Sequence, residues 1–395
     1  MVKPLNNITV LECGTGLTAP YTSSLLGDLG ANVVKIEGPE RDASRSWPPI
    51  RNGFSYYYAA INRNKRNIVI NLKTEGGREV FYKLAGRADV ILENFTPGTV
   101  DRLGIGYYNV KKINPKIIYC HISGFGWDSP YRDRAAFDYI MQGETGWMSF
   151  TGTPETPCRI GIPITDFITS LYALSAILSA LIYRDRYGEG VEIDISMWDC
   201  QLTSLLALAS IYWVENRVPG RMGMKYFFGP AYQPYRAKDG RWIILGIATT
   251  QHWRKFCEKY GLKKLLEDYP TIIDVQERRD KHSEMEEEIG RVIAGKESSE
   301  WVKLLTEDGI PSGVINNIAE VLNHSQTVSR GMIAKVIHKK LGEIKVVKSP
   351  FKTSRFNVEV VIPPSLPGEH TDEIMRELGY SEEEIKELKE IGAIS

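Results

Sequence analysis

The stretch that decides the fold is VLECGTGLTAPYTSSLLGDLGANVVKIE, residues 10–37. An apolar run over residues 8–13 predicts a strand, and residues 20–29 predict a helix with Pro20 at its first position and Gly30 at its end. Residues 31–37 predict the next strand. A strand, a helix and a second strand in this order are typical of a βαβ unit with parallel strands.

The same alternation continues through the first half of the chain. The further strands are expected at residues 68–72, 90–93, 117–122 and 191–197, and the further helices at 74–85, 166–187 and 198–215. Because parallel strands need helical crossovers, this pattern predicts an α/β fold in which helices cover a parallel sheet.

One expected helix also raises the alternative of a membrane span. Residues 167–183 (FITSLYALSAILSALIY) carry no charge. They are fewer than the ~20 residues that a span needs, and three charged residues, Arg184, Asp185 and Arg186, follow at once. We therefore expect a helix that is buried on most sides.

The composition changes around residues 216–231, where glycine and proline stand among arginine, methionine and aromatic residues. Beyond this stretch, Asp239-Gly240 between two strand-like runs predicts a β-hairpin. The expected organisation is a large domain over 1–215, a linker over 216–231, a small α+β domain over 232–320, and a segment over 321–395 that returns to the large domain.

Bulk composition excludes several classes of function. Lys+Arg and Asp+Glu number 49 each, so no net charge favours nucleic acid or an anionic membrane. Five cysteines without a CxxC spacing argue against a disulfide framework or a zinc site. With no apolar signal region at the start, these features predict a cytoplasmic protein without a bound metal.

The first turn of the expected βαβ unit matches G-x-G-x-x-A through Gly14, Gly16 and Ala19, and Glu37 ends the next strand. This is the pattern of dinucleotide sites, in which a pyrophosphate approaches a helix N-terminus. An NAD-dependent oxidoreductase is therefore one interpretation. A turn that serves another ligand, or only the fold, is the other.

Asp166 is the carboxylate of greatest interest, because it follows Pro163-Ile-Thr and opens the long apolar helix. In one interpretation it is an N-cap. In the other it is a nucleophile, since the helix dipole favours its ionised form and the apolar helix removes part of its water. His121, which ends an expected strand, is similarly open to a structural or a functional interpretation.

Basic residues gather in loops of the first half, where strand ends form ligand sites in such folds. They are Arg41, Arg45, Arg51, Lys65, Arg66, Lys73, Arg102, Arg132 and Arg134. Several of them would suit a phosphate-rich ligand, and Arg134 is one candidate contact. The loop ENFTPG, residues 93–98, could bring amides and an aromatic ring to the same ligand.

Taken in order, these pieces resemble the family III CoA-transferases, which include formyl-CoA:oxalate and carnitine CoA-transferases and the related α-methylacyl-CoA racemases. The stretches that carry the resemblance are residues 10–37, 62–77, 93–107, 122–126, 137–152, 163–167, 187–199, 239–247, 309–315 and 366–394. They span nearly the whole chain in the family's order.

The resemblance implies a Rossmann-like large domain built from both chain ends, a small domain between them, and an interlocked homodimer. Coenzyme A then enters as a substrate, with no permanently bound cofactor. Asp166 matches the family's nucleophilic aspartate, and Asp138 matches an acidic residue near the active site. The positions that match the CoA site are Gly16 and Leu17 in the first turn, Leu72, Lys73, Asn94, Phe95, Arg102 and Leu103.

The implied reaction moves CoA from an acyl-CoA thioester to a carboxylic acid through anhydride and thioester intermediates on Asp166. Backbone amides of residues 14–17 or 228–229 are candidates for oxyanion stabilisation. A non-catalytic acyl-CoA binding protein is a further alternative, disfavoured because Asp166 is retained.

This chain departs from parts of the family. Phe137 stands where the racemase branch has a histidine, which argues against proton abstraction. Leu17 and Gly38 replace the glutamine and arginine of the formyl/oxalate enzymes. Met222, Met224, Tyr226, Phe227 and Phe228 suggest either a roomy apolar acyl pocket or linker packing. The two acids stay open, with a C4–C5 dicarboxylate such as succinate, or a carnitine-like acid, as the suggestion from the family.

Overall fold

A computed structural model describes residues 2–226 and 228–395, and Phe227 therefore lies outside the described residues. The chain groups into two compact units. The first comprises Met1–Gly146, Ile160–Asn216 and Gln326–Ser395, and the second comprises Trp147–Arg159 and Arg217–Ser325. The chain thus leaves the first unit after residue 146 and re-enters it at residue 160, then leaves it again after residue 216 and returns at residue 326.

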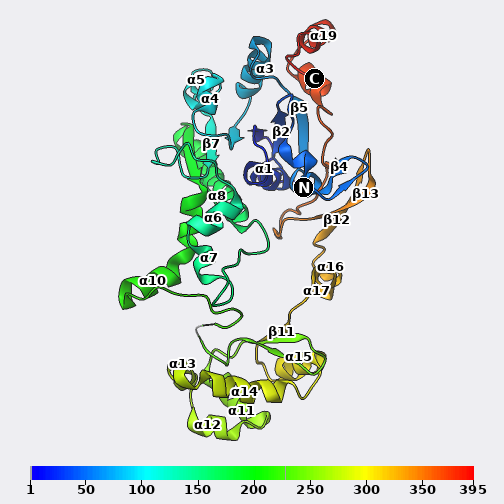
Figure 1. Ribbon diagram of the computed structural model, residues 1–395. Helices are drawn as coiled ribbons and strands as arrows, with labels where there is room; N and C mark the ends of the chain where they lie inside the picture. Colours follow the sequence, from blue (N-terminus) through cyan, green and yellow to red (C-terminus); the bar gives the residue numbers. More distant parts are fainter. Residues whose placement is uncertain (1, 227) are drawn as a thin grey trace. The chain divides into compact units, whose positions relative to one another are not determined.

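The first unit is built on a six-stranded parallel sheet in the order β5-β2-β1-β6-β7-β8 (Figure 1). The strands are β1 (Thr9–Glu12), β2 (Asn32–Glu37), β5 (Lys65–Val69), β6 (Val90–Glu93), β7 (Ile118–Ser123) and β8 (Val191–Ser196). The strand order reverses between β1 and β6. A crevice at the carboxyl ends of the strands is expected at such a reversal, and ligands of α/β proteins bind there.

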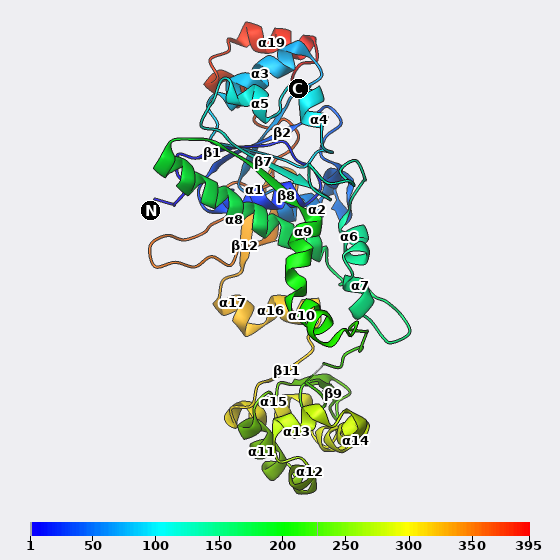
Figure 2. The same ribbon diagram turned by 90° about the vertical axis from the view of Figure 1, so that its left-hand side faces the viewer.

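Helices cover both faces of this sheet, as Figure 2 shows. One face carries α1 (Thr18–Asp28) and α8 (Ile164–Tyr187), and the other carries α3 (Glu75–Ala85), α4 (Thr99–Arg102), α5 (Tyr107–Lys111), α18 (Thr371–Glu377) and α19 (Glu382–Glu390). Neighbouring strand residues face opposite layers, so Val10 packs with α1 and α8 while Leu11 packs in the other core. The expected α/β fold with a covered parallel sheet is confirmed.

Smaller elements complete the first unit. They are a 3-10 turn at Ala43–Ser46, β3 (Ile50–Arg51), β4 (Phe54–Ser55), α2 (Tyr56–Ile61), α6 (Asp138–Glu144), α9 (Met197–Leu202), a 3-10 turn at Thr203–Leu205, α10 (Leu206–Glu215), β12 (Ile333–His338) and β13 (Gly342–Val347). The helix expected over residues 198–215 is therefore two helices. The predicted strand at residues 90–93 coincides with β6.

Two predicted helix starts are wrong. Helix α1 begins at Thr18, which makes Pro20 its third residue. Proline is tolerated there because the first four helical N–H groups have no partner inside the helix. Helix α8 begins at Ile164, with Pro163 in the N-cap position. Asp166 is therefore the third residue of the helix, and the N-cap interpretation does not hold.

The strand expected at residues 68–72 lies at Lys65–Val69. Its first residues are polar, so no run of apolar residues marks the start of the strand. Lys65 is nevertheless fully buried, and its ammonium donates to the carbonyl of Pro20 (2.6 Å), to Asn62 Oδ1 (2.7 Å) and to Glu12 Oε2 (3.2 Å).

Lys65 belongs to a buried cluster of charges beneath the first βα turn. Lys35 on β2 contacts Glu12 Oε1 on β1 at 2.9 Å and Asp42 Oδ2 at 2.8 Å, and it donates to the carbonyl of Gly14 at 2.9 Å. Burial disfavours the charge of Lys35, yet Glu12 and Asp42 raise its pKa above the usual value. Burial opposes ionisation of Asp42 as well, but Lys35 lowers the pKa of that carboxyl. Lys35 and Asp42 are thus held as ions, whereas burial lowers the pKa of Lys65 to about 7.

The second unit has its own sheet and core. Its antiparallel sheet has the order β11-β10-β9. Its elements are α7 (Trp147–Phe150), β9 (Pro234–Arg236), β10 (Trp242–Leu245), α11 (Thr250–Lys259), α12 (Lys263–Asp268), α13 (Ile272–Glu277), α14 (His282–Ile293), α15 (Ser298–Glu307), β11 (Ser312–Val314) and α16 (Ile318–Asn323), and α17 (Ser325–Ser329) follows. The hairpin predicted at Asp239-Gly240 joins β9 to β10. Buried Trp253 and Trp301 centre the core.

Within residues 2–226 and 228–395, α8 is the one helix long and apolar enough to cross a membrane by length and composition. Fewer than half of the residues in the most apolar part of this helix are buried. Leu171, Tyr172, Ile182 and Tyr183 are exposed along it. The expectation that this helix is buried on most sides is therefore wrong for the single chain.

We expect Lys35→Met to destabilise the chain by about 3–5 kcal/mol, because it leaves the buried carboxylate of Asp42 without its cation and leaves Glu12 with Lys65 alone. Urea unfolding followed by circular dichroism measures this loss. The matched control is Lys386→Met, since Lys386 is 79% exposed, and its effect should stay within about 0.5 kcal/mol. Equal effects of the two variants would contradict this account of the cluster.

Candidate active site

Asn94 links the segments that follow β1 and β6, the two strands between which the strand order reverses. It follows β6, and its Oδ1 accepts a hydrogen bond from the backbone N–H of Thr15 at 2.9 Å. Its Nδ2 donates to the carbonyl of Thr15 at 2.8 Å and to Thr18 Oγ1 at 3.0 Å. Asn94, which was predicted to line the CoA site, thus braces the turn after β1 with its side-chain amide.

The backbone donors of this turn are occupied by the protein's own side chains. The N–H of Gly14 donates to Glu12 Oε1 at 2.9 Å, and that of Gly16 donates to Asp42 Oδ1 at 3.2 Å. With the N–H of Thr15 bound to Asn94, none of these three amides is available for a pyrophosphate or for an oxyanion. A dinucleotide site needs free backbone N–H groups at this turn, so these bonds argue against that interpretation.

Glu37, the acidic residue of that interpretation, is engaged as well. Arg45 Nη2 donates to its Oε1 at 2.7 Å, Asn67 Nδ2 donates to the same oxygen at 2.8 Å, and the N–H of Asp42 donates to its Oε2 at 3.1 Å. A carboxylate surrounded by protein donors has little capacity left for ribose hydroxyls. The geometry does not support NAD binding at this turn.

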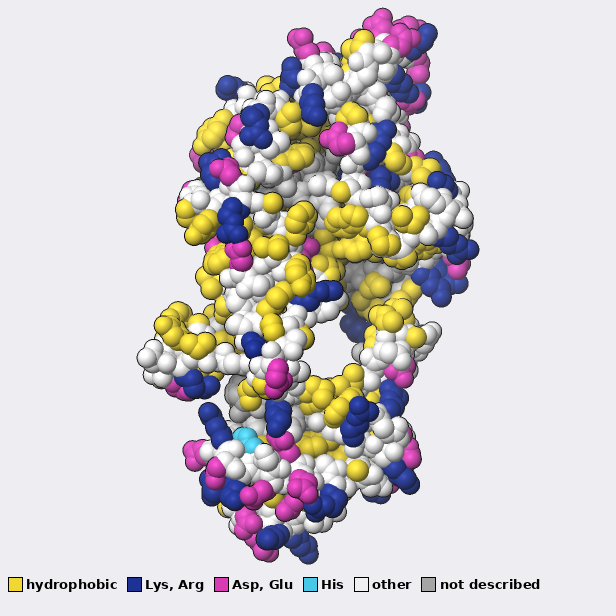
Figure 3. Space-filling model, viewed as in Figure 1, with side chains coloured by type: hydrophobic (Ala, Val, Ile, Leu, Met, Phe, Trp, Pro, Cys, Tyr) yellow, Lys and Arg dark blue, Asp and Glu magenta, His cyan; other side chains and the backbone are white. Residues whose placement is uncertain are grey.

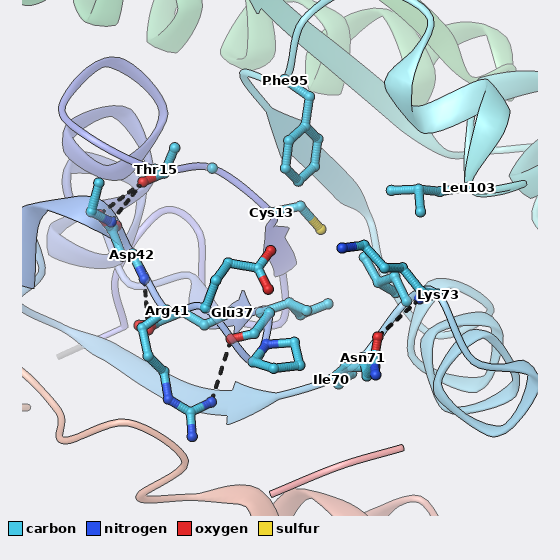
Figure 4. Close-up of a pocket in the computed structure, with 17 residues that line it drawn as sticks. Cys13, Thr15, Glu37, Arg41, Asp42, Ile70, Asn71, Lys73, Phe95 and Leu103 are labelled. Atoms are coloured by element: carbon cyan, nitrogen blue, oxygen red, sulfur yellow. Dashed lines mark hydrogen bonds between the residues drawn. The ribbon is translucent and has the colours of Figure 1, made fainter. Parts of the chain in front are cut away.

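A cavity of about 320 Å³ opens at the carboxyl ends of β1, β2, β5 and β6 (Figure 4). Its lining residues are Cys13, Gly14, Thr15, Ile36, Glu37, Gly38, Pro39, Glu40, Arg41, Asp42, Ala43, Ile70, Asn71, Leu72, Lys73, Phe95 and Leu103. Four of the predicted CoA-site positions, Leu72, Lys73, Phe95 and Leu103, are among them. Figure 4 shows Phe95, Leu103 and Lys73 around one space. The cavity therefore combines apolar surface with a cation.

The other predicted CoA contacts lie outside this lining. Leu17 is buried in the fold. Gly16 has a φ of 77°, a conformation that favours glycine, and an added Cβ would lie 3.5 Å from the ring of Trp47. Arg102 Nη2 donates to Thr99 Oγ1 at 2.8 Å. Arg134 pairs with Glu144 on α6.

Asp166 lies where α8 packs closely on α1. Ser170, one turn beyond Asp166, donates through Oγ to the carbonyl of Thr18 at 3.0 Å, and Thr22 Oγ1 donates back to the carbonyl of Ser170 at 3.2 Å. Phe167 meets the ring of Tyr21 edge-on at 5.1 Å between centroids. Small hydroxyl side chains allow this close approach. Since α1 begins directly after the glycine-rich turn, the packing places Asp166 at the same end of the sheet.

The carboxyl of Asp166 is poorly stabilised as an anion. Burial, and next to it the charge of Asp138, raise its pKa to about 7. Among the residues that the structure describes, none donates a hydrogen bond to this carboxylate. The helix dipole was expected to favour the ionised form, but the loss of water outweighs this effect. Such a carboxylate is a stronger nucleophile than a solvated one.

Asp138, at the start of α6, is bound through both oxygens. Its Oδ1 accepts the N–H of Thr165 at 2.8 Å, and its Oδ2 accepts Nε2 of Gln142 at 2.8 Å. Because Thr165 is the second residue of α8, Asp138 provides the N-terminal hydrogen bond that Pro163 cannot. Asp138 thus holds the backbone of Thr165, the residue that precedes Asp166.

Tyr57 on α2 belongs to the same site and was not predicted. Burial, followed by the charges of Asp166 and Asp138, raises the pKa of its hydroxyl to about 12. Its ring meets Trp47 edge-on at 5.2 Å between centroids. The signal in the sequence is the run Tyr56-Tyr57-Tyr58, which does not say which ring faces the site. Tyr58 is fully buried instead.

The structural interpretation of His121 agrees with its surroundings. The ring is 1% exposed, its Nδ1 lies 2.5 Å from Glu93 Oε1, and its Nε2 lies 3.2 Å from Glu192 Oε1. Trp127 packs on its face, with 3.9 Å between ring centroids. Both ring nitrogens are occupied, so the histidine faces no open cleft.

The proposed acyl-pocket residues belong to the second unit. Met222 and Met224 line a cavity of about 570 Å³ together with Tyr235 and Trp242. Phe228 packs against other aromatic residues, with Tyr226 at 5.2 Å and Tyr232 at 5.6 Å between centroids. The packing of Phe228 matches the linker interpretation, and Phe227 is outside the described residues.

Comparisons with known proteins agree with one another. Residues 5–371 match the model of the family described as CoA-transferase family III. The chain is similar to the succinyl-CoA:glutarate CoA-transferase of Mus musculus, at 34% identity over 100% of this chain and 91% of that protein. It is similar to the succinate–glutarate CoA-transferase of Agrobacterium fabrum, at 34% identity over 95% of this chain and 96% of that protein. A solved CAIB/BAIF family protein from Brucella suis, 33% identical, matches with a TM-score of 0.83 over 96% of this chain and 100% of that one.

We expect Asp138→Asn to lower the pKa of Asp166 by about one unit, because it removes the adjacent negative charge. Nuclear magnetic resonance of isotope-labelled aspartate carboxyl carbons measures the midpoint, and the spectrum of Asp166→Asn identifies the signal. The control is Asp185→Asn, which is 75% exposed near the far end of α8 and should leave the midpoint at about 7. A signal of the unaltered chain that titrates near 4, as an ordinary aspartate does, would contradict the burial described above.

Proposed function

The chain belongs to CoA-transferase family III and transfers CoA between acyl-CoA and acid substrates, and we propose that it does so through covalent intermediates on Asp166. The observation that carries the proposal is the partly buried carboxylate of Asp166, which no described residue stabilises as an anion. It follows a helix start that is fixed by Asp138.

The first half of the reaction splits the donor thioester. An oxygen of the Asp166 carboxylate attacks the thioester carbonyl, the carbon–sulfur bond breaks, and CoA leaves as a thiolate. The product is a mixed anhydride of Asp166 and the donor acid. The thiolate then attacks the Asp166 carbonyl, the donor acid leaves as a carboxylate, and Asp166 holds CoA as a thioester.

The second half runs the same chemistry in reverse with the acceptor. The acceptor carboxylate attacks the Asp166 thioester and again releases the thiolate. The thiolate then attacks the acceptor's acyl carbon, which frees the Asp166 carboxylate. Every bond broken is replaced by another of the same kind, so the cycle needs no net proton, water or nucleotide. Burial of Asp166 serves the cycle because water would hydrolyse either intermediate.

The supporting residues have roles that follow from their contacts. Asp138 fixes the start of α8 through the N–H of Thr165 and raises the pKa of Asp166. The hydroxyl of Tyr57 stays protonated because its pKa is about 12, so it can donate a hydrogen bond to an oxygen at the reacting carbon. The first turn, in which the amides of Gly14, Thr15 and Gly16 are occupied, acts as scaffold for α1 and α8.

The cavity at the strand ends is proposed to hold the CoA nucleotide. Phe95 and Leu103 offer apolar surface to an adenine ring, and Lys73 offers a cation to a phosphate. The other parts of CoA are proposed to contact the remaining predicted residues, which are Gly16, Leu17, Asn94, Arg102 and Arg134. Coenzyme A enters and leaves as substrate, and no permanently bound cofactor is proposed.

The acids are proposed to be C4–C5 dicarboxylates, with succinyl-CoA as donor and glutarate as acceptor. The support is that the relatives from Mus musculus and Agrobacterium fabrum carry these acids in their names. Leu17 in place of a glutamine and Gly38 in place of an arginine argue against oxalate or formate. Phe137 in place of a histidine argues against racemase activity, because no base stands there.

We propose that two chains form an interlocked homodimer. Apolar side chains are exposed on α8 and also on α10, where hydrophobic side chains gather at the surface (Figure 3) and where the exposed residues are Leu206, Tyr212, Trp213 and Val214. Exposed apolar patches mark protein interfaces or membrane contacts, and a second copy of the chain accounts for them without a membrane.

The cytoplasm is the proposed location, since all five cysteines are free thiols.

Incubation with succinyl-CoA followed by hydroxylamine should convert the Asp166 carboxyl to a hydroxamate, because hydroxylamine captures an activated aspartyl carbonyl. Peptide mass spectrometry reads out the mass change at this residue. The yield should rise as the pH increases through about 7, the pKa of Asp166, because the attacking form is deprotonated.

The matched controls for this trapping are Asp166→Asn, which should show no hydroxamate, and Asp185→Asn, which should be trapped like the unaltered chain. Other acyl-CoAs test the choice of donor. Acyl-CoA binding without a hydroxamate at Asp166 from any donor would rule out the covalent mechanism.

Lys73→Met should weaken CoA binding about 5- to 10-fold, since it removes one phosphate contact from the nucleotide cavity. Isothermal titration with CoA measures the dissociation constant. The effect should shrink at high salt, because the lost contact is electrostatic and exposed. Lys386→Met serves again as the control with unchanged affinity, and an unchanged affinity for Lys73→Met would place the nucleotide elsewhere.

A further inference from the structure

Gln142 is a fully buried side chain on α6, four residues after Asp138. Its carboxamide makes three hydrogen bonds within the first unit. Nε2 donates to Asp138 Oδ2 at 2.8 Å and to the carbonyl of Ile162 at 3.4 Å, and Oε1 accepts the N–H of Ile160 at 2.8 Å. Donor and acceptor capacities are both used, which is the condition for burying an amide at low cost.

The chain path gives these bonds their importance. Residues 147–159 group with the second unit, so α6 and the start of α8 are connected along the chain only by a segment that leaves the first unit. Ile160 is the residue at which the chain re-enters, and Asp166 follows within six residues. Without side-chain bonds, the position of Asp166 relative to Asp138 would depend on the conformation of that excursion.

We propose that Gln142 is a positioning residue of the transfer reaction, which ties the Asp138 carboxylate to the segment entering α8 and so fixes Asp166 beside Asp138. This role rests on the proposed function of Asp166 as nucleophile. One carboxamide connects both sides of the gap, because its nitrogen binds Asp138 while its oxygen binds Ile160. Asp138 in turn binds the N–H of Thr165.

The neighbouring groups define what a substitution changes. Asp138 on α6 and Tyr57 on α2 are the titratable groups that interact with Asp166. Methionine at position 142 matches glutamine in length but makes none of the three bonds. Glutamate keeps the oxygen that accepts from Ile160 and, when protonated, also donates to Asp138. When ionised, it repels Asp138 instead.

The test compares Gln142→Met and Gln142→Glu with the unaltered chain, using succinyl-CoA and glutarate between pH 6 and pH 8. For Gln142→Met we expect kcat to fall about 10- to 100-fold at every pH, with KM for the acyl-CoA changed less than about twofold, because the nucleophile is displaced while CoA binding is not. For Gln142→Glu the ratio of its kcat to that of the unaltered chain should be closest to one at pH 6 and fall as the pH rises. The rate of hydroxamate formation at Asp166 should follow the same ratios.

The matched control is Asn114→Leu, which removes an amide in the segment before β7 that donates to the carbonyls of Ala85 and Ala88, and which should alter thermal stability without this change in kcat. A ratio for Gln142→Glu that does not vary with pH, or a Gln142→Met variant that melts earlier but keeps its kcat, overturns the positioning role. If the unaltered chain forms no hydroxamate at Asp166, the proposed function fails and the role of Gln142 fails with it. If the unaltered chain does form the hydroxamate, but the kcat ratio of Gln142→Glu does not change with pH, only the role of Gln142 is overturned.

Discussion

The buried ion cluster of Glu12, Lys35 and Asp42 is the constraint on which the rest of the first unit depends. It joins β1, β2 and the loop after β2 at a point where no water can replace a lost partner. The same carboxylates accept from the amides of Gly14 and Gly16, so the charges also fix the shape of the first turn. Because α1 starts from this turn, the cluster sets the position of the helix against which α8 packs.

The site is then assembled from three elements that start or end at the same edge of the sheet. Helix α8 brings Asp166, α6 brings Asp138, and α2 brings Tyr57. Hydroxyl side chains hold α1 against the first turns of α8, while hydrogen bonds from α6 hold the segment before it. A half-buried carboxylate to which no described residue donates a hydrogen bond is unfavourable as an anion. It is kept here because both flanks of the helix start are fixed.

The elements that sequence patterns predicted well are those whose burial follows from apolar runs. The strand at residues 90–93 and the hairpin around Asp239-Gly240 are examples. Polar residues that are buried with hydrogen-bond partners carry no such pattern, which is why β5, with Lys65 at its start, was expected three residues too late. Asp166 was recognised as a candidate, but its pKa depends on burial and on Asp138, 28 residues away in the chain. Tyr57 was missed because nothing in a run of three tyrosines distinguishes the ring that faces the site.

The self-occupied turn after β1 has a consequence for how glycine motifs are interpreted across protein families. A G-x-G-x-x-A pattern encodes a backbone shape, and that shape can be used to accept a ligand or to receive the protein's own carboxylates. In this chain the deciding residues are Lys35 and Asp42, which stand outside the motif. Motif searches for nucleotide cofactors would gain selectivity by testing for a buried lysine on the second strand and an acidic residue just after it, since that pair marks a turn whose amides are already bound.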